Sequence, residues 1–252
     1  MIKWYKFAAV CCLLAIVCSC GSRYEVSHVE GRCVTMDSVW DTHPNEEAIA
    51  LLAPYKTKLD SMMSHVIGVS AQAMDADRPE SLLGNLVADV VRQSSTSVLG
   101  VPADMGLVNI GGIRNSLAKG DITVSDVFEI LPFENTLCVL TLKGTLLKHL
   151  FENIAARGGE GVSGVQLVIS RDGRLLNAKI GGKSIDDECS YTVATIDYLS
   201  EGNDGMSALP QAVKHDCPSN LIIRDLFMNH VANLTKQGKP LNSRLDGRIV
   251  VK

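Results

Sequence analysis

Residues 80–91, ESLLGNLVADVV, carry the strongest periodic pattern in the chain. The spacing i, i+1, i+4, i+5, i+8 and i+9 predicts a helix that buries one broad stripe of its surface. The stretch TLLKHLFENIAARGG (145–159) repeats the pattern and reaches Gly158, a typical helix stop. The stripe of the first helix is Leu82, Leu83, Leu86, Val87, Val90 and Val91.

Two further helices are expected, over residues 45–65 and 220–236. Ser219 is placed to cap the second of them. Apolar residues recur at helical spacing in both ranges, so one face of each helix is expected to point toward the core. These residues are Ile49, Leu52, Leu59 and Met62 in the first helix, and Ile223, Leu226, Phe227, Val231 and Leu234 in the second.

Short strand candidates lie between the helices, and RDGR (171–174) is typical of a hairpin turn joining two of them. The candidates are residues 66–72, 105–110, 136–142, 164–170, 175–180 and 191–196, with a shorter one at 32–36. Strands mixed with helices in this order predict an α+β (mixed α/β) fold, with helices packed on a mixed β-sheet. No linker rich in Pro, Gly or Ser divides residues 45–252, which favours one globular domain.

The N-terminus is typical of a targeting segment. Lys3 and Lys6 precede an apolar run over residues 7–17 that is too short to span a bilayer. Residues 17–20, VCSC, resemble a bacterial lipobox, which implies that Cys20 receives lipid and becomes the new N-terminus. The alternative is an ordinary signal peptide that is cleaved nearby.

The expected organisation therefore has three parts: a signal peptide over 1–19, a lipidated tether over 20–44, and a globular domain over 45–252. We expect an exported protein, lipid-anchored to a bacterial membrane and facing the periplasm. Cleavage removes two lysines and no acid, so the net charge moves from -4 to -4 minus 2, or -6. This charge disfavours a nucleic-acid partner.

Four of the eight cysteines follow the targeting segment: Cys33, Cys138, Cys189 and Cys217. Their wide spacing, with no C-x-x-C pair, argues against a zinc site. An exported compartment permits disulfides, and three pairings are open. Cys138 lies in the apolar strand TLCVLTL and is expected to be a small buried hydrophobe.

The stretch VNIGGIRNSL (108–117) leaves a strand and passes two glycines to reach an arginine. Gly111 and Gly112 would let backbone N–H groups approach a ligand closely, and Arg114 offers five donors to a phosphate, carboxylate or hydroxyl. The pattern indicates a ligand-facing corner. The alternative is a plain turn with a solvated arginine.

Two aromatic residues lie in loops at strand ends, where sheets commonly bind ligands. Phe133 stands in LPFEN directly before a strand, and Tyr198 stands in IDYLSEGNDG directly after another. Only 5% of the chain is aromatic, so two aromatic rings in loops favour a ligand site over packing on a helix.

In this order, these stretches resemble the C-terminal domain of the 5'-nucleotidases, found in bacterial periplasmic UDP-sugar hydrolases and animal ecto-5'-nucleotidase. The match runs along about residues 45–250, through ESLLGNLVADVV, VNIGGIRNSLAKGDITVSDVFEILPFENTL, LKGTLLKHLFEN, VSGVQL and YTVATIDYLSEGNDGM. So long an ordered series is far more specific than a lone glycine motif.

The resemblance implies a nucleotide-recognition domain. Two aromatics would clamp the base, an aspartate would contact the ribose, and stacking on rings is worth about 1–3 kcal/mol per base. Arg78 is a further candidate contact for phosphate or ribose. The other implied binding residues are Asn109, Gly111, Gly112, Arg114, Phe133, Tyr198, Gly202 and Asp204.

Several positions depart from the family pattern. Tyr198 replaces a phenylalanine and adds a hydroxyl that needs a partner. Asn203 replaces a glycine, and it is expected to tolerate the positive φ of that position. Pro79 stands where the family has an arginine, which Arg78 replaces one residue earlier, and Leu82 replaces an asparagine.

In complete family members, a metallophosphatase domain holds two metals through Asp-x-His and Gly-Asn-His-Asp/Glu motifs. None of the six histidines of this chain lies in a Gly-Asn-His context. Asp41-Thr42-His43 imitates the first motif but follows no apolar strand. The glycine-rich stretch 158–161 follows a helix and is interpreted as a flexible helix exit rather than a phosphate-binding loop.

Because the metal motifs are missing, we predict no catalytic residue, metal ligand or cofactor on this chain.

The combined prediction is a nucleotide- or nucleoside-recognition module of a 5'-nucleotidase-type phosphoester hydrolase. It would act in nucleotide catabolism with a separately encoded metallophosphatase chain that carries the divalent metals, and it would not be catalytic alone. One alternative is a non-catalytic periplasmic nucleoside- or nucleotide-binding lipoprotein. Another is a structural remnant that has lost its ligand.

Overall fold

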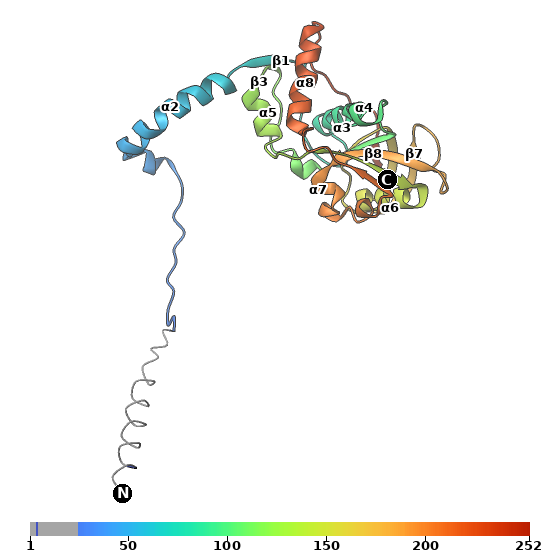
Figure 1. Cartoon of the computed structure of the whole chain (residues 1–252), viewed down its shortest axis with the longest axis horizontal. Coiled ribbons are helices and arrows are strands. Elements are labelled where there is room, and N and C mark those ends of the chain that lie inside the picture. The colour runs from blue at the N-terminus through green and yellow to red at the C-terminus, as the bar shows by residue number, and fades with distance from the viewer. Residues whose placement is uncertain (1–3, 5–24) are drawn as a thin grey trace. The chain divides into compact units, whose positions relative to one another are not determined.

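The computed structural model describes Trp4 and residues 25–252 (Figure 1). Trp4 aside, the predicted signal peptide lies outside the described residues, and so does Cys20. The chain divides into two compact units, Met1–Leu52 and Ala53–Lys252. The expected start of the globular domain at residue 45 stays a prediction. In the described ranges, every helix is too short or too polar to span a membrane.

The segment that precedes the first long helix has little regular structure. Residues 25–36 form neither helix nor strand, and a 3-10 helix, η1, follows at Ser38–Thr42. The predicted strand at 32–36 is therefore wrong. Val34 and Met36 are exposed and pair with no neighbouring strand, and an isolated strand has no partner for its backbone hydrogen bonds.

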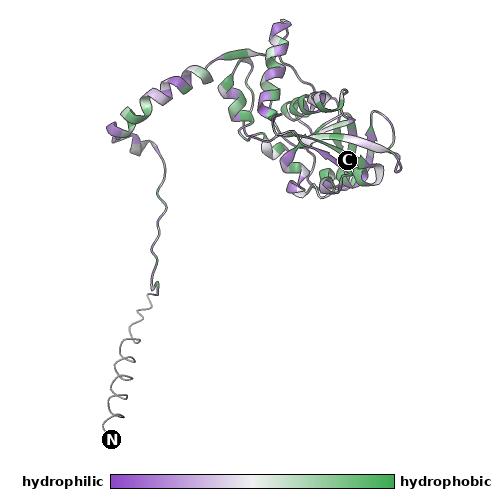
Figure 2. Cartoon of the chain, in the orientation of Figure 1, coloured by the Kyte–Doolittle hydropathy of each residue, from purple (hydrophilic) through white to green (hydrophobic). Residues whose placement is uncertain are grey.

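Helix α2 (Glu46–Met63) forms where the sequence predicts it, with Glu46 and Glu47 in its positive first turn. The expectation that its apolar residues face the core is wrong, because none of the residues of α2 is buried. Ile49, Leu52 and Leu59 are all more than half exposed. Figure 2 shows hydrophobic and hydrophilic residues together along this helix. The spacing of its apolar residues predicts the helix correctly, but it does not predict whether the helix is buried.

The second unit is built on a five-stranded mixed sheet in the order β5-β2-β8-β4-β9. Strand β2 runs parallel to β8, and the other pairs are antiparallel. The strands are β2 (Met105–Val108), β4 (Leu137–Lys143), β5 (Gly161–Ser163), β8 (Ser190–Ile196) and β9 (Lys214–Asp216). The predicted mixed α+β fold is confirmed.

Both faces of this sheet are covered, since all residues of β2 are buried. Helix α3 (Leu82–Ser94) packs on β2, β5 and β8, and α6 (Gly144–Ala156) packs near β4 and β8 on the other side (Figure 1). A Cβ atom on Gly106 would lie 2.5 Å from the Ala88 carbonyl oxygen, so glycine is what allows α3 to sit close to β2.

The buried faces of these helices follow the periodic patterns closely. In α3, Leu83, Leu86, Val87, Val90 and Val91 are buried, and Leu82 is half-buried. Helix α6 ends before Gly158, whose φ of 77° suits a helix terminus. A short helix, α4 (Thr96–Leu99), follows α3.

Two smaller sheets flank the central one. Strand β1 (Val66–Ser70) pairs antiparallel with β3 (Gly120–Thr123), which leads into α5 (Val124–Ile130). Strand β6 pairs antiparallel with β7 and parallel with β10. The predicted hairpin turn at 171–174 joins β6 and β7, with Gly173 at φ 80°. The ranges of these strands are Val165–Ile169, Leu175–Ile180 and Ile249–Val251.

Helix α8 begins later than predicted, at Ile223 rather than at residue 220, and runs to Lys236. Ser219 is not its N-cap, since Ile222 holds that position. The Leu137 N–H donates to the Leu221 carbonyl (2.8 Å), and the Ile223 N–H donates to the Asn135 carbonyl (2.9 Å). This pairing holds the chain extended beside β4, so the helix cannot start before residue 223.

Cys138 is joined to Cys217 by a disulfide, with Cα atoms 4.2 Å apart. Cys138 is fully buried, as expected, but it is disulfide-bonded rather than simply a small hydrophobe. Val139 pairs with Asp216 across antiparallel strands, which places the two cysteines opposite each other. Strand β9 was not among the predicted strands, so this pairing was not visible in the sequence. Cys33 and Cys189 are free and exposed.

Candidate functional site

The predicted site residues gather at one edge of the central sheet. Strands β2 and β8 are parallel, so both end there, and β4 begins there because Leu137 pairs with Ile196 at the end of antiparallel β8. Three loops therefore leave this edge, at residues 109–114, 131–136 and 197–205. Sheet topology brings together segments that lie far apart in the sequence.

The first loop is a tight turn through η2 (Ile110–Gly112). The Gly112 N–H donates to the Asn109 carbonyl (3.0 Å), and Arg114 Nη1 donates to the Gly111 carbonyl (3.0 Å). A Cβ atom on Gly112 would lie 2.7 Å from Asn109 Oδ1, so a larger residue would displace that side chain. Gly111 and Arg114 are exposed and therefore accessible to a ligand.

The third loop holds Asp204 in a left-handed backbone conformation. The loop runs through the short helix α7 (Asp197–Ser200) and η3 (Asn203–Gly205), and Asp204 has φ 54° between Gly202 (φ 88°) and Gly205 (φ 77°). The expectation that Asn203 takes the positive φ is wrong. Its Nδ2 instead donates to the Tyr198 carbonyl (2.8 Å), which ties the loop back onto α7.

Asp204 links two of the three loops. Asn109 Nδ2 donates to Asp204 Oδ2 (2.7 Å), and the Tyr198 hydroxyl donates to Asp204 Oδ1 (3.4 Å). The hydroxyl that Tyr198 adds to the family pattern therefore has a partner. The structure brings Asn109, Tyr198 and Asp204 into one hydrogen-bonded group.

Both predicted clamp rings are open to solvent: Phe133 is 49% exposed and Tyr198 is 41% exposed. The Phe133 loop leads into β4 and the Tyr198 loop follows β8, and these neighbouring strands meet at the same edge, where Leu137 pairs with Ile196. Stacking of a ligand between the two rings stays a prediction. Both rings are accessible to a ligand, whereas the core aromatics Phe151 and Phe227 are fully buried.

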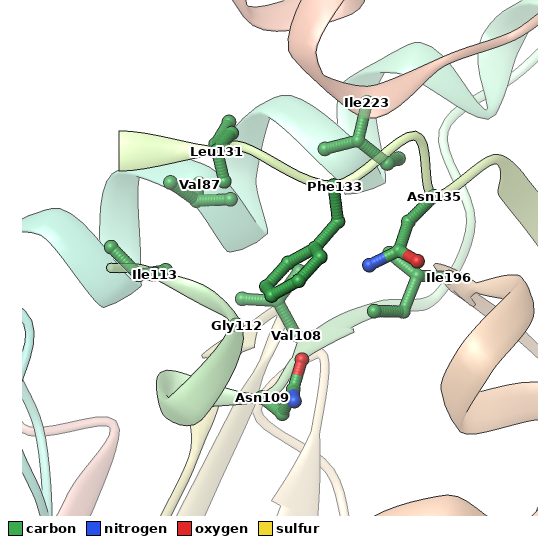
Figure 3. A pocket seen from close by; sticks show the side chains of 10 residues that line it. All are labelled: Val87, Val108, Asn109, Gly112, Ile113, Leu131, Phe133, Asn135, Ile196 and Ile223. Carbon is green, nitrogen blue, oxygen red and sulfur yellow. The ribbon is translucent and has the colours of Figure 1, made fainter. Parts of the chain in front are cut away.

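Phe133 covers a small cavity and lies near Asn109 (Figure 3). The cavity has a volume of about 20 Å³, room for about one water molecule. A heterocycle would therefore lie outside it, against the open face of the ring. The rest of the lining is Val87, Val108, Gly112, Ile113, Leu131, Asn135, Ile196 and Ile223.

The loop that carries Phe133 is held by Arg224, which the sequence reasoning missed. The Arg224 side chain is buried and lies 4.0 Å from the centre of the Phe128 ring. Its Nη1 donates to the carbonyls of Leu131 (3.4 Å) and Pro132 (3.2 Å). The available signal was an arginine next to Ile223 in the apolar stripe of the predicted helix.

Glu160, also missed, lies behind the first loop with a fully buried side chain. Its Oε1 accepts from Arg78 Nη2 and Arg157 Nε (both 2.6 Å), and its Oε2 accepts from the Ile110 N–H (2.6 Å). The hydrogen bond to Glu160 stabilises the charged guanidinium and raises the pKa of Arg157. The stretch 158–161 is thus an anchored segment. The expectation of a flexible helix exit overlooked the buried side chain of Glu160.

Arg78 lies beside Glu160 rather than in the loops that carry Asp204 and Phe133. Its Nε also donates to the Gly159 carbonyl (2.9 Å), and about a third of its side chain remains exposed (31%). A contact between Arg78 and a ligand phosphate stays a prediction.

Residues 25–252 contain no group of three or more His, Cys, Asp or Glu side chains placed to hold a metal ion. Asp41 and His43, which imitate a metal motif, are exposed, and His43 Nδ1 lies 2.8 Å from Thr42 Oγ1. These residues do not fit the pair of divalent metals that phosphoester hydrolysis by a metallophosphatase requires.

The sequence of this chain matches a known protein family. The family profile described as 5'-nucleotidase, C-terminal domain, matches residues 66–211. The trifunctional nucleotide phosphoesterase protein YfkN of Bacillus subtilis is 30% identical over 82% of this chain and 15% of that protein. An apyrase of Aedes aegypti is 29% identical over 90% of this chain and 42% of that protein.

Solved structures have the same fold. A 5'-nucleotidase precursor from Thermus thermophilus matches with a TM-score of 0.71 and 29% identity, over 81% of this chain and 43% of that one. The NAD nucleotidase of Haemophilus influenzae shares the fold at a TM-score of 0.62 and 19% identity, over 82% of this chain and 42% of that one. This chain thus spans less than half the length of each of these four relatives. The chain belongs to the 5'-nucleotidase C-terminal domain family.

Proposed function

We propose that this chain recognises a nucleotide or nucleoside and serves as the recognition module of a 5'-nucleotidase-type phosphoester hydrolase. The observation that carries the proposal is the hydrogen-bonded group of Asn109, Tyr198 and Asp204 at the sheet edge from which Phe133 also emerges. Exposed rings beside an oriented carboxylate suit a ligand that joins a flat heterocycle to a hydroxylated sugar.

Five side chains around the sheet edge have proposed roles in binding the ligand. Phe133 and Tyr198 stack on the base, which tolerates any heterocycle because every base has a π-face. Asp204 keeps lone pairs free to accept hydrogen bonds from the ribose hydroxyls. Arg114 donates to a phosphate or to ribose, and Arg78 is a second candidate for the phosphate.

The chemical step is proposed to take place on another chain. We propose a separately encoded metallophosphatase that carries the divalent metals and receives the phosphate end of the bound nucleotide. The joint activity is hydrolysis of 5'-nucleotides or related phosphoesters in nucleotide catabolism. The names of the relatives, a nucleotide phosphoesterase, an apyrase and a 5'-nucleotidase, support this reaction class.

The location of the protein is proposed from its first residues. Lipid on Cys20 would hold it on a bacterial membrane, facing the periplasm. Metabolic labelling with a radioactive fatty acid tests the anchor: the wild type should incorporate label, and Cys20→Ser should not. Equal labelling of both proteins would contradict lipidation at this residue.

Calorimetric titration of the purified chain with adenosine, AMP and a UDP-sugar tests the recognition role. We expect saturable binding of at least one of the three, at one site per chain. Absence of heat with all three, by a chain that unfolds cooperatively, would contradict the proposal and favour a remnant that has lost its ligand.

A further inference from the structure

Glu160 is a buried acid that contacts no solvent and has three donors. Both of its oxygens are used: Oε1 by Arg78 and Arg157, and Oε2 by the Ile110 N–H. A buried carboxylate is costly unless it is paired and hydrogen-bonded, and here both conditions hold. Its three partners come from three different segments of the chain.

Two of these contacts connect Glu160 to Asp204 through an intermediate residue. On one route, Glu160 fixes Ile110, and the preceding residue, Asn109, donates to Asp204 Oδ2 at 2.7 Å. On the other route, Arg157 spans the gap from Glu160 to Asp204, with its Nη2 3.7 Å from Asp204 Oδ2. Glu160 therefore supports Asp204 from two directions without touching it.

The backbone around Glu160 leaves little room for it to move. Gly159 has φ 112°, and a Cβ atom there would lie 2.4 Å from the Pro79 carbonyl oxygen. A Cβ atom on Gly161 would lie 2.9 Å from the Gly84 carbonyl oxygen. Glu160 thus lies between two residues whose backbones are closely packed, and this packing restricts movement of its own backbone.

We infer that Glu160 is a positioning residue of the nucleotide site, which holds the Asp204 carboxylate in place to bind the ribose hydroxyls. The inference rests on the proposed function and adds to it a residue outside the loops at the sheet edge. Glutamine cannot replace this acid, because its amide nitrogen would face either the two guanidinium groups or the Ile110 N–H, and all of these are donors.

The experiment compares adenosine with 2',3'-dideoxyadenosine, which keeps the base and the 5'-hydroxyl and lacks the 2'- and 3'-hydroxyls that Asp204 is proposed to bind. We expect Glu160→Gln to weaken adenosine binding about tenfold, because interactions within one network couple strongly. Binding of the dideoxy compound should change little. A general structural defect would weaken both ligands alike.

Asp89→Asn is the matched control. Asp89 is another paired carboxylate, with Arg248 Nη1 and Nη2 at 2.8 and 2.9 Å, and its other partner is Ser163. This variant should lose stability and keep the wild-type affinity for both compounds. If Glu160→Gln does not fold, Arg157→Gln at a partly exposed position cuts one of the two routes and should show the same selectivity for adenosine.

Two results would overturn the inference. One is a folded Glu160→Gln protein with wild-type adenosine affinity, and the other is equal loss of both ligands by this variant and by Arg157→Gln. A wild type that binds neither compound, and also binds neither AMP nor a UDP-sugar, overturns the proposed function itself, and the role of Glu160 falls with it. Binding by the wild type with no selective loss in the variants overturns the role of Glu160 alone.

Discussion

Asp204 combines an unusual backbone conformation with a side chain that is proposed to bind the ligand. Its φ of 54° is tolerated by Gly, Asn and Asp and is unfavourable for other side chains, while its carboxylate accepts from Asn109 and Tyr198. A substitution at this position therefore changes loop conformation, charge or both. The choice of replacement separates the two effects.

We predict that Asp204→Asn keeps the stability of the fold and weakens binding of ribose-bearing ligands, because asparagine tolerates positive φ but lacks the carboxylate. Asp204→Ala should show the same loss of binding and also lose about 1 kcal/mol of stability from backbone strain. Denaturant unfolding and calorimetry measure the two effects. Equal stabilities of the Asn and Ala variants would contradict the backbone argument.

His230 makes stability depend on pH. Burial lowers its pKa below the usual 6.5, and the nearby charge of Asp89 acts in the opposite direction. As the pH falls, the unfolded chain binds the proton first, so this contribution to stability is present above pH 6.5 and is lost as the pH falls toward the lower folded-state pKa.

We predict that His230→Gln loses less stability than the wild type on acidification from about pH 7.5 to about pH 5.5. Denaturant unfolding at these two pH values measures the loss of unfolding free energy for each protein. Identical losses would show that another group causes the acid destabilisation.

The segment of residues 217–224 is the element that secures the Phe133 loop. It is bonded to β4 by the Cys138–Cys217 disulfide at its start, and it pairs with Leu137 and Asn135 along its length. It ends at Arg224, which binds the carbonyls of Leu131 and Pro132. A covalent bond and a buried guanidinium thus fix both sides of the loop.

We predict that replacing Cys138 and Cys217 together by alanine lowers the free energy of unfolding by about 3 kcal/mol, because the bond closes a long loop of the unfolded chain. The two cysteines are 79 residues apart in the sequence. Cys33→Ser with Cys189→Ser is the control, since both are free and exposed, and it should change stability little. Equal unfolding midpoints for the three proteins would contradict a structural role for the bond.

At the element scale, local patterns predicted what depends on local physics. The stripes of α3 and α6 and the strands β2, β4 and β8 follow from helical or apolar periodicity. Helix α2 shows the limit, because its apolar residues recur at helical spacing, yet none of its residues is buried. Strand β9 is the tripeptide KHD, which has no apolar alternation, so neither this strand nor the disulfide beside it was predicted.

The candidate site shows the same limit at longer range. The family resemblance named Asn109 and Asp204 separately, but the bond between them joins residues 95 positions apart and depends on parallel β2 and β8. Glu160 and Arg224 were missed because a charged residue near a helix end or on a helix stripe is usually solvated. Only the folded chain shows that both are buried.

For the molecule as a whole, recognition and catalysis are proposed to reside on different chains. Every residue of the proposed site lies in the unit Ala53–Lys252. We predict that the purified chain releases negligible phosphate from AMP, and that release requires both a divalent metal and the partner metallophosphatase. A colorimetric phosphate assay with each component omitted in turn checks this.

Robust metal-dependent release by this chain alone would contradict the division of labour. Nucleotide binding without stimulation of a candidate phosphatase would favour the alternative of a non-catalytic binding lipoprotein. A neighbouring reading frame with Asp-x-His and Gly-Asn-His motifs and its own signal peptide would identify the partner to test.

The most direct measurement is the affinity for adenosine or AMP of the wild type, Phe133→Ala and Tyr198→Ala, with Tyr55→Ala as control. Tyr55 is a more exposed aromatic, at 72%, on helix α2. If two rings clamp the base, each site variant should lose about 1–3 kcal/mol of binding free energy. Tyr55→Ala should bind like the wild type. Unchanged affinity in both site variants would contradict the clamp.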